Sequence, residues 1–130
     1  MPDNHGKVVW SELNTRDPVA AAAFFETVLG VSSVETHTQN GSIYRTLKKG
    51  DEMVAGILDI SGPEFAGAPA SWLTYLGCDD VDAACEAVKS AGGMVMSAPF
   101  DIPFVGRVAV IKDPTDPVVA LMTPAAGGQS

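Results

Sequence analysis

The sequence predicts an α+β fold made of two copies of a strand-helix-strand-strand-strand unit. Residues 10–30 (WSELNTRDPVAAAAFFETVLG) and residues 72–92 (WLTYLGCDDVDAACEAVKSAG) share a strand-like start, an Asp-led turn and an Ala-rich helical segment. Three segments rich in β-forming residues follow each of them. Because each copy alone has too little apolar area to bury, we expect both copies to fold as one unit.

In the first copy the helix is expected over residues 18–29. Asp17 suits the N-cap, Pro18 suits the first turn, and Gly30 suits the left-handed position that ends a helix. Ala21, Phe25, Val28 and Leu29 lie on one face of this helix, which we expect to be buried. Strands are expected over residues 31–37, 43–47 and 53–60, with Asn40-Gly41 as a hairpin turn between the first two.

In the second copy the helix is expected over residues 80–91. An offset of 62 places Asp79 at the N-cap and Gly92 at the C-terminal end. Its apolar face would consist of Val81, Ala84, Val88 and Ala91. Strands are expected over residues 94–97, 105–111 and 118–122.

The length of 130 residues predicts a single domain over residues 1–130. We place the first module at about residues 7–60, the second at about 71–124, and a flexible tail at 125–130, with residues 1–6 also loose. Cys78 and Cys85 fit neither a zinc site nor a disulfide framework, and we expect both in the core.

The composition argues against two classes of partner. Sixteen acidic residues against eight basic ones give a net charge of −8, which disfavours nucleic acid. No apolar run approaches the ~20 residues that span a bilayer, and no signal peptide is evident. The expected location is the cytoplasm.

The two modules, the helix ending FFETVLG and the closing pattern GR…KDPTDPVVAL resemble the vicinal oxygen chelate superfamily. This superfamily includes glyoxalase, bleomycin-resistance proteins and extradiol dioxygenases. The resemblance covers nearly the whole chain, and it implies paired cup-shaped mixed sheets around a ligand cavity. It specifies the fold more than the function, because the fold hosts lyases, isomerases, dioxygenases and drug binders.

Metal-using members of this family place His, Gln or Glu on the first and last strands of each module. The resemblance puts these positions at Trp10 and Gly56 in the first module, with Ile57 as the neighbour of Gly56. In the second module it puts them at Trp72 or Leu73, and at Ala120 or Leu121. None of these side chains offers the nitrogen, oxygen or sulfur donor that a divalent ion needs. We therefore predict no metal and no cofactor.

Glu12 is the candidate catalytic residue and also a candidate ligand contact. Strand alternation places it on one face with Trp10. It acts either as a rim carboxylate paired with Arg45 or Arg107, or as an acid, base or cation anchor with apolar walls around it. Trp10 and Trp72 belong either to the core or to a clamp around a flat or cationic ligand.

The other candidate ligand-binding residues are Arg45, Arg107 and Phe104. The two arginines lie on equivalent strands and bind a carboxylate or phosphate, or else they hold the hairpins through Asp51 or Asp113. Phe104 belongs to SAPFDIPFVGR, interpreted either as a lid loop or as a turn whose aromatics plug the barrel. Tyr44 and Tyr75 are further polar groups for such a cavity.

Three functions fit the sequence. The leading one is a metal-free protein that binds a small aromatic or cationic molecule. The alternatives are a lyase, isomerase or dioxygenase-like enzyme that uses Glu12 or an atypical metal site, and a non-catalytic structural or regulatory dimer. A homodimer is expected because open sheet edges are commonly covered by a second chain.

Overall fold

The computed structural model describes residues 4–37, 43–102 and 106–124. Its contacts divide the chain into two compact units. The N-terminal unit comprises Trp10–Leu73, and the C-terminal unit comprises Thr74–Ser130 together with Met1–Val9. Eight strands and two α-helices occur in the described part of the chain, which confirms the expected α+β class.

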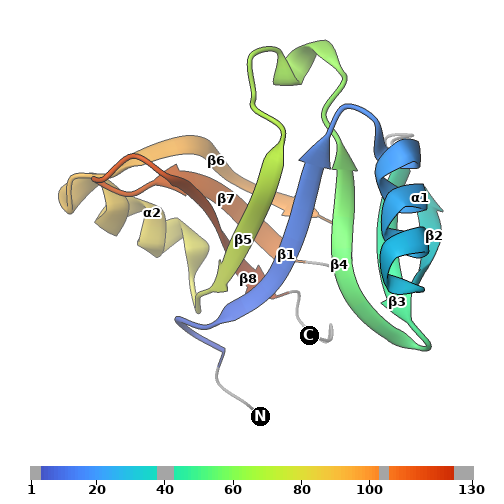
Figure 1. The fold of residues 1–130 in the computed structure, drawn as a ribbon. Coiled ribbons are helices and arrows are strands. Elements are labelled where there is room, and N and C mark those ends of the chain that lie inside the picture. The colour runs from blue at the N-terminus through green and yellow to red at the C-terminus, as the bar shows by residue number, and fades with distance from the viewer. Residues whose placement is uncertain (1–3, 38–42, 103–105, 125–130) are drawn as a thin grey trace. The chain divides into compact units, whose positions relative to one another are not determined.

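The N-terminal unit follows the expected order of strand, helix and three further strands (Figure 1). Its elements are β1 (Val8–Thr15), which belongs to this unit from Trp10 onward, α1 (Pro18–Leu29), β2 (Ser32–His37), β3 (Ile43–Lys49) and β4 (Glu52–Asp59), followed by the short helix η1 (Pro63–Phe65). The strands lie in the order β2-β3-β4-β1, with β1 parallel to β4 and antiparallel pairing elsewhere. This mixed four-stranded sheet is covered on one face by α1.

Helix α1 begins and ends as the sequence predicts. The Asp17 carboxylate accepts a hydrogen bond from the Ala20 amide at 3.1 Å, and Gly30 takes a left-handed conformation with φ 71°. Ala22 is buried in the core between helix and sheet, where it packs with Leu47, Ala55 and Ile57. The predicted buried face is therefore wrong in part. Val28 is exposed, as is Leu29 at the end of the helix, and neither joins this core.

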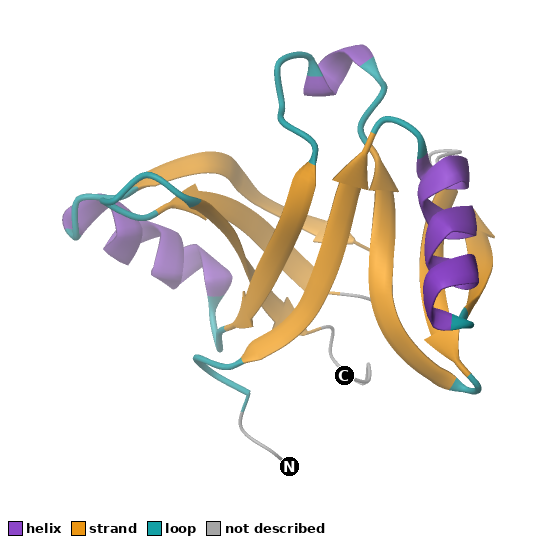
Figure 2. Cartoon of the chain, in the orientation of Figure 1, coloured by secondary structure: helices purple, strands orange, loops and turns teal. Residues whose placement is uncertain are grey.

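The C-terminal unit repeats the pattern with β5 (Ser71–Gly77), α2 (Val81–Ser90), β6 (Met94–Ile102), β7 (Gly106–Lys112) and β8 (Val118–Pro124) (Figure 2). Residues of β5 from Thr74 onward belong to this unit. The strands lie in the order β5-β8-β7-β6, and β5 is parallel to β8. Both units thus place a parallel pair at the side of the sheet formed by their first and last strands.

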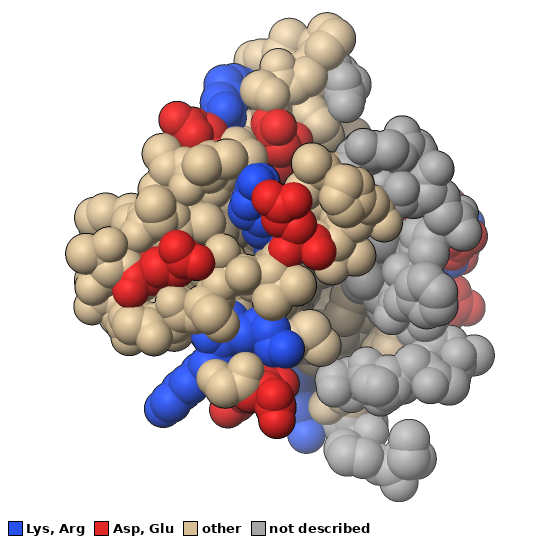
Figure 3. All heavy atoms as spheres, turned by 90° about the vertical axis from the view of Figure 1, so that its right-hand side faces the viewer, with Lys and Arg blue, Asp and Glu red and all other residues tan. Residues whose placement is uncertain are grey.

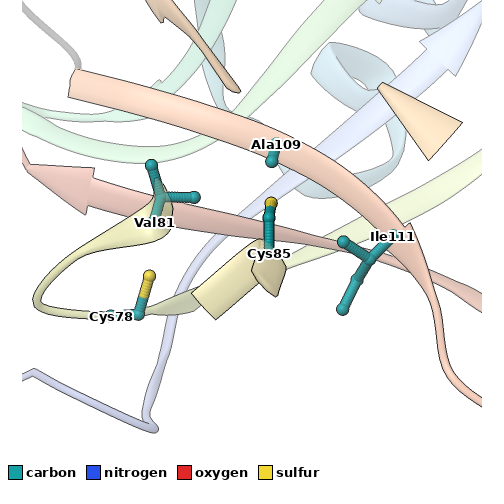
Figure 4. Close-up of a cluster of buried hydrophobic side chains, with 5 residues drawn as sticks. All are labelled: Cys78, Val81, Cys85, Ala109 and Ile111. Carbon is teal, nitrogen blue, oxygen red and sulfur yellow. The ribbon is translucent and has the colours of Figure 1, made fainter. Parts of the chain in front are cut away.

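The core of the C-terminal unit lies between α2 and its sheet (Figure 4). Its buried members are Cys78, Val81, Cys85, Ala109 and Ile111. Both cysteines are free thiols, as expected for core residues. The predicted cap of α2 is wrong by one residue, because the Asp80 carboxylate rather than Asp79 accepts the Ala83 amide, at 3.1 Å.

Two further expectations need correction. Strand β6 runs to Ile102, so the first part of SAPFDIPFVGR pairs with β7 and is not a loop. Residues 4–6 are not loose, since the Gly6 amide donates to the Gly77 carbonyl at 2.8 Å. Residues 103–105, the Asn40-Gly41 turn and residues 125–130 lie outside the described part. Among the described residues, no helix is long and apolar enough to cross a membrane.

Candidate functional site

A chain of hydrogen bonds joins Trp10, Tyr44 and Glu12 on the face of the N-terminal sheet that α1 leaves uncovered. The Trp10 indole Nε1 donates to the Tyr44 hydroxyl at 3.1 Å, and that hydroxyl donates to Glu12 Oε2 at 2.9 Å. Leu13 packs toward α1, so strand alternation turns Trp10 and Glu12 the other way. The prediction that Trp10 and Glu12 share a face agrees with this arrangement.

Gly56 makes the contact between Tyr44 and Glu12 feasible. It lies on β4 between its register partners, Thr46 on β3 and Glu12 on β1. A Cβ atom at this position would overlap the Tyr44 hydroxyl and ring. The missing side chain therefore leaves the space through which Tyr44 reaches across β4 to the carboxylate of Glu12.

The electrostatics of this group keep the phenol protonated. Burial, followed by the negative charge of Glu12, raises the pKa of Tyr44 well above its ordinary value of 10. Glu12 itself is 4% exposed, which is rare for a carboxylate unless hydrogen bonds or charges compensate it. The group thus combines two half-buried aromatic residues, Trp10 and Tyr44, with the buried acidic side chain of Glu12.

Asn14 extends the polar face along β1. It stands two residues beyond Glu12 and pairs in register with Leu58, which in turn pairs with Tyr44. Within the described residues its Oδ1 atom is buried and has no hydrogen-bond partner. Such an unsatisfied acceptor calls for a donor from water or a ligand. The alternation of β1 predicted Asn14 on this face, but the sequence could not show that its Oδ1 atom lacks a hydrogen-bond donor.

Trp72 lies apart from Trp10 in the N-terminal unit. Its ring meets that of Phe25 on α1 edge-to-face at a centroid distance of 5.8 Å, and Trp72 is about half exposed. Phe25 packs on the core beneath α1, so the ring of Trp72 belongs to the helix side. The structure therefore does not bring Trp10 and Trp72 together as the two walls of a clamp.

The two arginines also lie on the helix sides of their sheets. Arg45 alternates with Tyr44 and forms an ion pair with Glu35, its register partner on β2, at 2.8 Å. Arg107 has the same parity as the core residue Ala109 and bonds both carboxylate oxygens of Asp82 on α2, at 2.8 and 3.1 Å. The arginines were expected to hold the hairpins through Asp51 or Asp113, and these partners are wrong.

Arg107 also contacts Asp101 on β6 at 3.2 Å. Its guanidinium holds the pKa of Asp82 below the usual 3.8, and the hydrogen bonds to Asp82 and Asp101 raise its own pKa. This arginine thus fastens α2 and β6 to β7. Phe104, the remaining candidate, lies outside the described residues.

The matching positions of the second module, at about residues 71–124, are largely apolar. Tyr75 pairs with Ala120 as Glu12 pairs with Gly56, which makes Tyr75 the counterpart of Glu12 and Leu73 the counterpart of Trp10. Val108 stands where Tyr44 stands in the other unit and is 1% exposed. The alignment slip that favours Leu73 over Trp72 is therefore the correct one.

Among the described residues, the donors on the Trp10 face do not fit a divalent metal. No group of three or more His, Cys, Asp or Glu residues that would hold an ion occurs within the described residues. On the Trp10 face the acidic side chain is Glu12. The space over Gly56, its register partner on β4, is filled by the Tyr44 phenol. A phenol that stays protonated is a poor partner for a divalent ion, which prefers ionised or strongly basic donors.

Comparison with known proteins gives the family directly. The model of the glyoxalase/bleomycin resistance protein/dioxygenase superfamily matches residues 7–119. CFP32 of Mycobacterium tuberculosis, named provisionally as a glyoxylase, is 39% identical over 120 residues, which cover 92% of this chain and 45% of CFP32. The anthracycline biosynthesis protein DnrV of Streptomyces peucetius is 29% identical over 127 residues, covering 89% of this chain and 46% of DnrV.

Solved structures show the same fold at low sequence identity. Methylmalonyl-CoA epimerase of Streptomyces coelicolor superposes with a TM-score of 0.67 at 17% identity, covering 97% of this chain and 99% of the epimerase chain. A hypothetical protein of Bacillus halodurans superposes with a TM-score of 0.68 at 12% identity, covering 95% and 98%. At these identities the likeness concerns the fold alone.

The chain spans slightly less than half the length of the curated relatives, since it covers 45% of CFP32 and 46% of DnrV. Both matches nevertheless extend over most of this chain. The family match over residues 7–119 shows that the chain belongs to the glyoxalase/bleomycin resistance protein/dioxygenase superfamily.

Proposed function

We propose that this protein binds a small aromatic cation, without a metal ion, on the sheet face that carries Trp10, Tyr44 and Glu12. The observation that carries the proposal is the hydrogen-bonded chain from the Trp10 indole through the Tyr44 hydroxyl to the buried carboxyl group of Glu12. Trp10 and Tyr44 are half-buried, and Glu12 is buried.

This arrangement matches the chemistry of aromatic cations. Indole and phenol rings attract a cation through their negative faces, and a carboxylate nearby adds a direct charge attraction. The unsatisfied Oδ1 of Asn14 on the same face offers an acceptor for an N–H or O–H of the ligand. The net charge of −8 favours cationic molecules over anionic ones through long-range steering.

The name of DnrV suggests the ligand class to test first. Anthracyclines are planar, fused-ring aromatic compounds, and doxorubicin carries a protonated amine on its sugar. The relation rests on 29% identity over less than half of DnrV, so doxorubicin serves as a probe and not as the assigned natural ligand. The expected location of such a binding protein is the cytoplasm.

A second candidate function is catalysis with Glu12 as an acid or base. It is favoured by one observation, namely that Glu12 is 4% exposed and hydrogen bonded to a phenol. Buried carboxyl groups with a specific partner are frequent among catalytic acids and bases. In that case Glu12 would move a proton on a bound substrate, and Tyr44 would orient its carboxyl group. A catalytic function would also require that a small molecule binds at this face, so the binding experiment comes first.

The experiment uses the tryptophans as separate reporters, because the chain contains two. In Trp72→Phe the remaining Trp10 reports on the proposed site, and in Trp10→Phe the remaining Trp72 reports on the helix side. Doxorubicin should quench Trp10 fluorescence in a saturable way in the first variant. Equal quenching of Trp72 in the second variant would place the binding elsewhere and contradict the proposal.

The role of charge is tested with N-acetyl doxorubicin, which keeps the rings but lacks the cation. Glu12→Gln should weaken doxorubicin binding about tenfold, equivalent to about 1.4 kcal/mol, and should hardly affect the acetylated compound. As a control, Glu35→Gln removes a carboxylate that pairs with Arg45 on the other face of the sheet. If Glu35→Gln weakens binding as much as Glu12→Gln does, general charge and not the site explains the affinity.

A further inference from the structure

Asn14 holds a buried hydrogen-bond acceptor inside the N-terminal unit. Its Oδ1 atom has no donor within hydrogen-bond distance in the described part of the protein. Leu58 is its register partner on β4, and Tyr44 is the partner of Leu58 on β3, so an aliphatic side chain and a ring share its face. An acceptor in such surroundings destabilises the folded chain unless water or a bound molecule supplies a donor.

The two arginines of this unit are engaged elsewhere. Arg16 donates to two backbone carbonyls, one in η1 and one just after it. Arg45 lies on the helix side of the sheet and pairs with Glu35. Figure 3, which views the side of α1 and β2, shows acidic and basic atoms next to one another on that side. Neither arginine therefore supplies the donor that Asn14 lacks.

The second module shows that the fold does not require a polar side chain at this position. Gly77 pairs with Met122 as Asn14 pairs with Leu58, which makes Gly77 the counterpart of Asn14. Strand β5 thus forms with no side-chain acceptor there. Asparagine is also depleted from strands in general. Asn14 is therefore neither required by the fold nor favoured by its strand, which points to a role in binding.

We propose that Asn14 selects the class of cation that binds on the Trp10 face, namely protonated amines with N–H groups and not quaternary ammonium ions. This inference rests on the proposed binding function. Glu12 lies two residues from Asn14 on the same face, about 6–7 Å along the strand. A cation drawn to Glu12 is therefore close enough to turn an N–H toward Asn14 Oδ1. The rings of Trp10 and Tyr44 attract both kinds of cation, so the acceptor makes the difference.

The unsatisfied acceptor also links stability to binding. In the free protein Asn14 Oδ1 has lost its hydration without a replacement, whereas in the complex an N–H of the amine takes the place of water. A trimethylated amine keeps the charge and the ring but leaves the acceptor unsatisfied. Leucine has the same branching at Cγ as asparagine and no polar atom there. Asn14→Leu should therefore stabilise the free protein and reduce the preference for the amine.

Displacement of doxorubicin tests the preference with two probes, 2-(2-naphthyl)ethylamine and its N,N,N-trimethyl derivative. Both carry one positive charge on the same ring system, and only the first has N–H groups. The ratio of their affinities should favour the primary amine about tenfold more in the unmodified chain than in Asn14→Leu. Asn14→Asp keeps an acceptor at this position and should retain the preference. Urea unfolding of the free protein should show a higher midpoint for Asn14→Leu than for the unmodified chain.

The outcomes separate the selection by Asn14 from the binding function itself. If doxorubicin does not bind to the unmodified chain, the binding function fails and the selection fails with it. If doxorubicin binds but neither amine displaces it, or the ratio of their affinities is unchanged in Asn14→Leu, the function stands and only the selection is overturned. A lower urea midpoint for Asn14→Leu would also overturn it, because the free protein would then already satisfy this acceptor.

Discussion

At the scale of single residues, the site depends on an absence. Gly56 has no side chain, and the Tyr44 ring occupies the space that a side chain would need. The sequence predicted that Trp10 and Glu12 share a face, because alternation along one strand is a local property. It did not predict that Tyr44 joins them, because that contact crosses β4 and depends on the register of three strands.

Replacing Gly56 with alanine should therefore destabilise the protein. The added Cβ overlaps the Tyr44 hydroxyl and ring, and overpacking of this kind costs about 1–3 kcal/mol. Urea unfolding monitored by circular dichroism measures the change. In a Tyr44→Ala background the space is free, so Gly56→Ala should cost much less there. Equal costs in both backgrounds would show that Tyr44 does not occupy this space.

At the scale of elements, the sequence located both helices but chose the wrong cap for one of them. Asp17 was identified because it stands alone before Pro18, whereas α2 is preceded by two adjacent aspartates, Asp79 and Asp80. Either could cap a helix by residue type, and an offset of 62 taken from the tryptophans favoured Asp79. The strand ladders show the offset to be 63 at this point, since Tyr75 matches Glu12.

Local sequence patterns also failed to predict the buried face of α1 and the positions of the two arginines. Helical periodicity grouped Val28 and Leu29 with Phe25, but α1 has apolar residues on all sides, so periodicity alone could not select the covered face. Arg45 and Arg107 were matched by the same offset of 62. The ladders show that Arg45 corresponds to Ala109, so the two arginines do not form a symmetric pair.

The ion pair between Arg107 and Asp82 should give the protein a defined acid dependence. The pKa of Asp82 is lowered in the folded state, mainly by hydrogen bonds from Arg107. Its contribution to stability is therefore present above its ordinary pKa of about 4 and is lost as the pH falls through the lower folded value. Asp82→Asn should reduce the urea midpoint at neutral pH, and the difference should vanish in strong acid.

Arg107→Gln provides the control for this ion pair. In that background the pH dependence of the Asp82→Asn effect should be smaller, because the main group that lowers the pKa of Asp82 is gone. The effect in the unmodified background should be modest, since the pair is exposed and screened by salt. A difference that grows on acidification would contradict this account.

At the scale of the whole molecule, the family and the order of elements followed from the sequence because each element has its own local signal. Caps, turns and alternation identify a helix or strand without knowledge of its neighbours. The site followed less completely. Trp10 and Glu12 were predicted to share a face, and Tyr44 was named as a further polar group. The hydrogen bonds that join the three, the role of Gly56 and the helix-side position of Trp72 required the strand register and the packing of α1.

The donor inventory of the chain leads to the last prediction, which concerns metal. Zn²⁺, Ni²⁺, Mn²⁺ and Fe²⁺ should bind no more tightly than they do to any acidic protein surface. A stable site usually needs three or more protein ligands, and the described residues contain no such group of His, Cys, Asp or Glu. Equilibrium dialysis followed by elemental analysis of tag-free protein measures the stoichiometry. Glu12→Gln and Asp51→Asn, which remove one buried and one exposed carboxyl group, should lower the bound metal equally. One equivalent of tightly held metal that is lost in Glu12→Gln but kept in Asp51→Asn would contradict the proposed metal-free binding function. It would favour the metal-dependent enzyme instead.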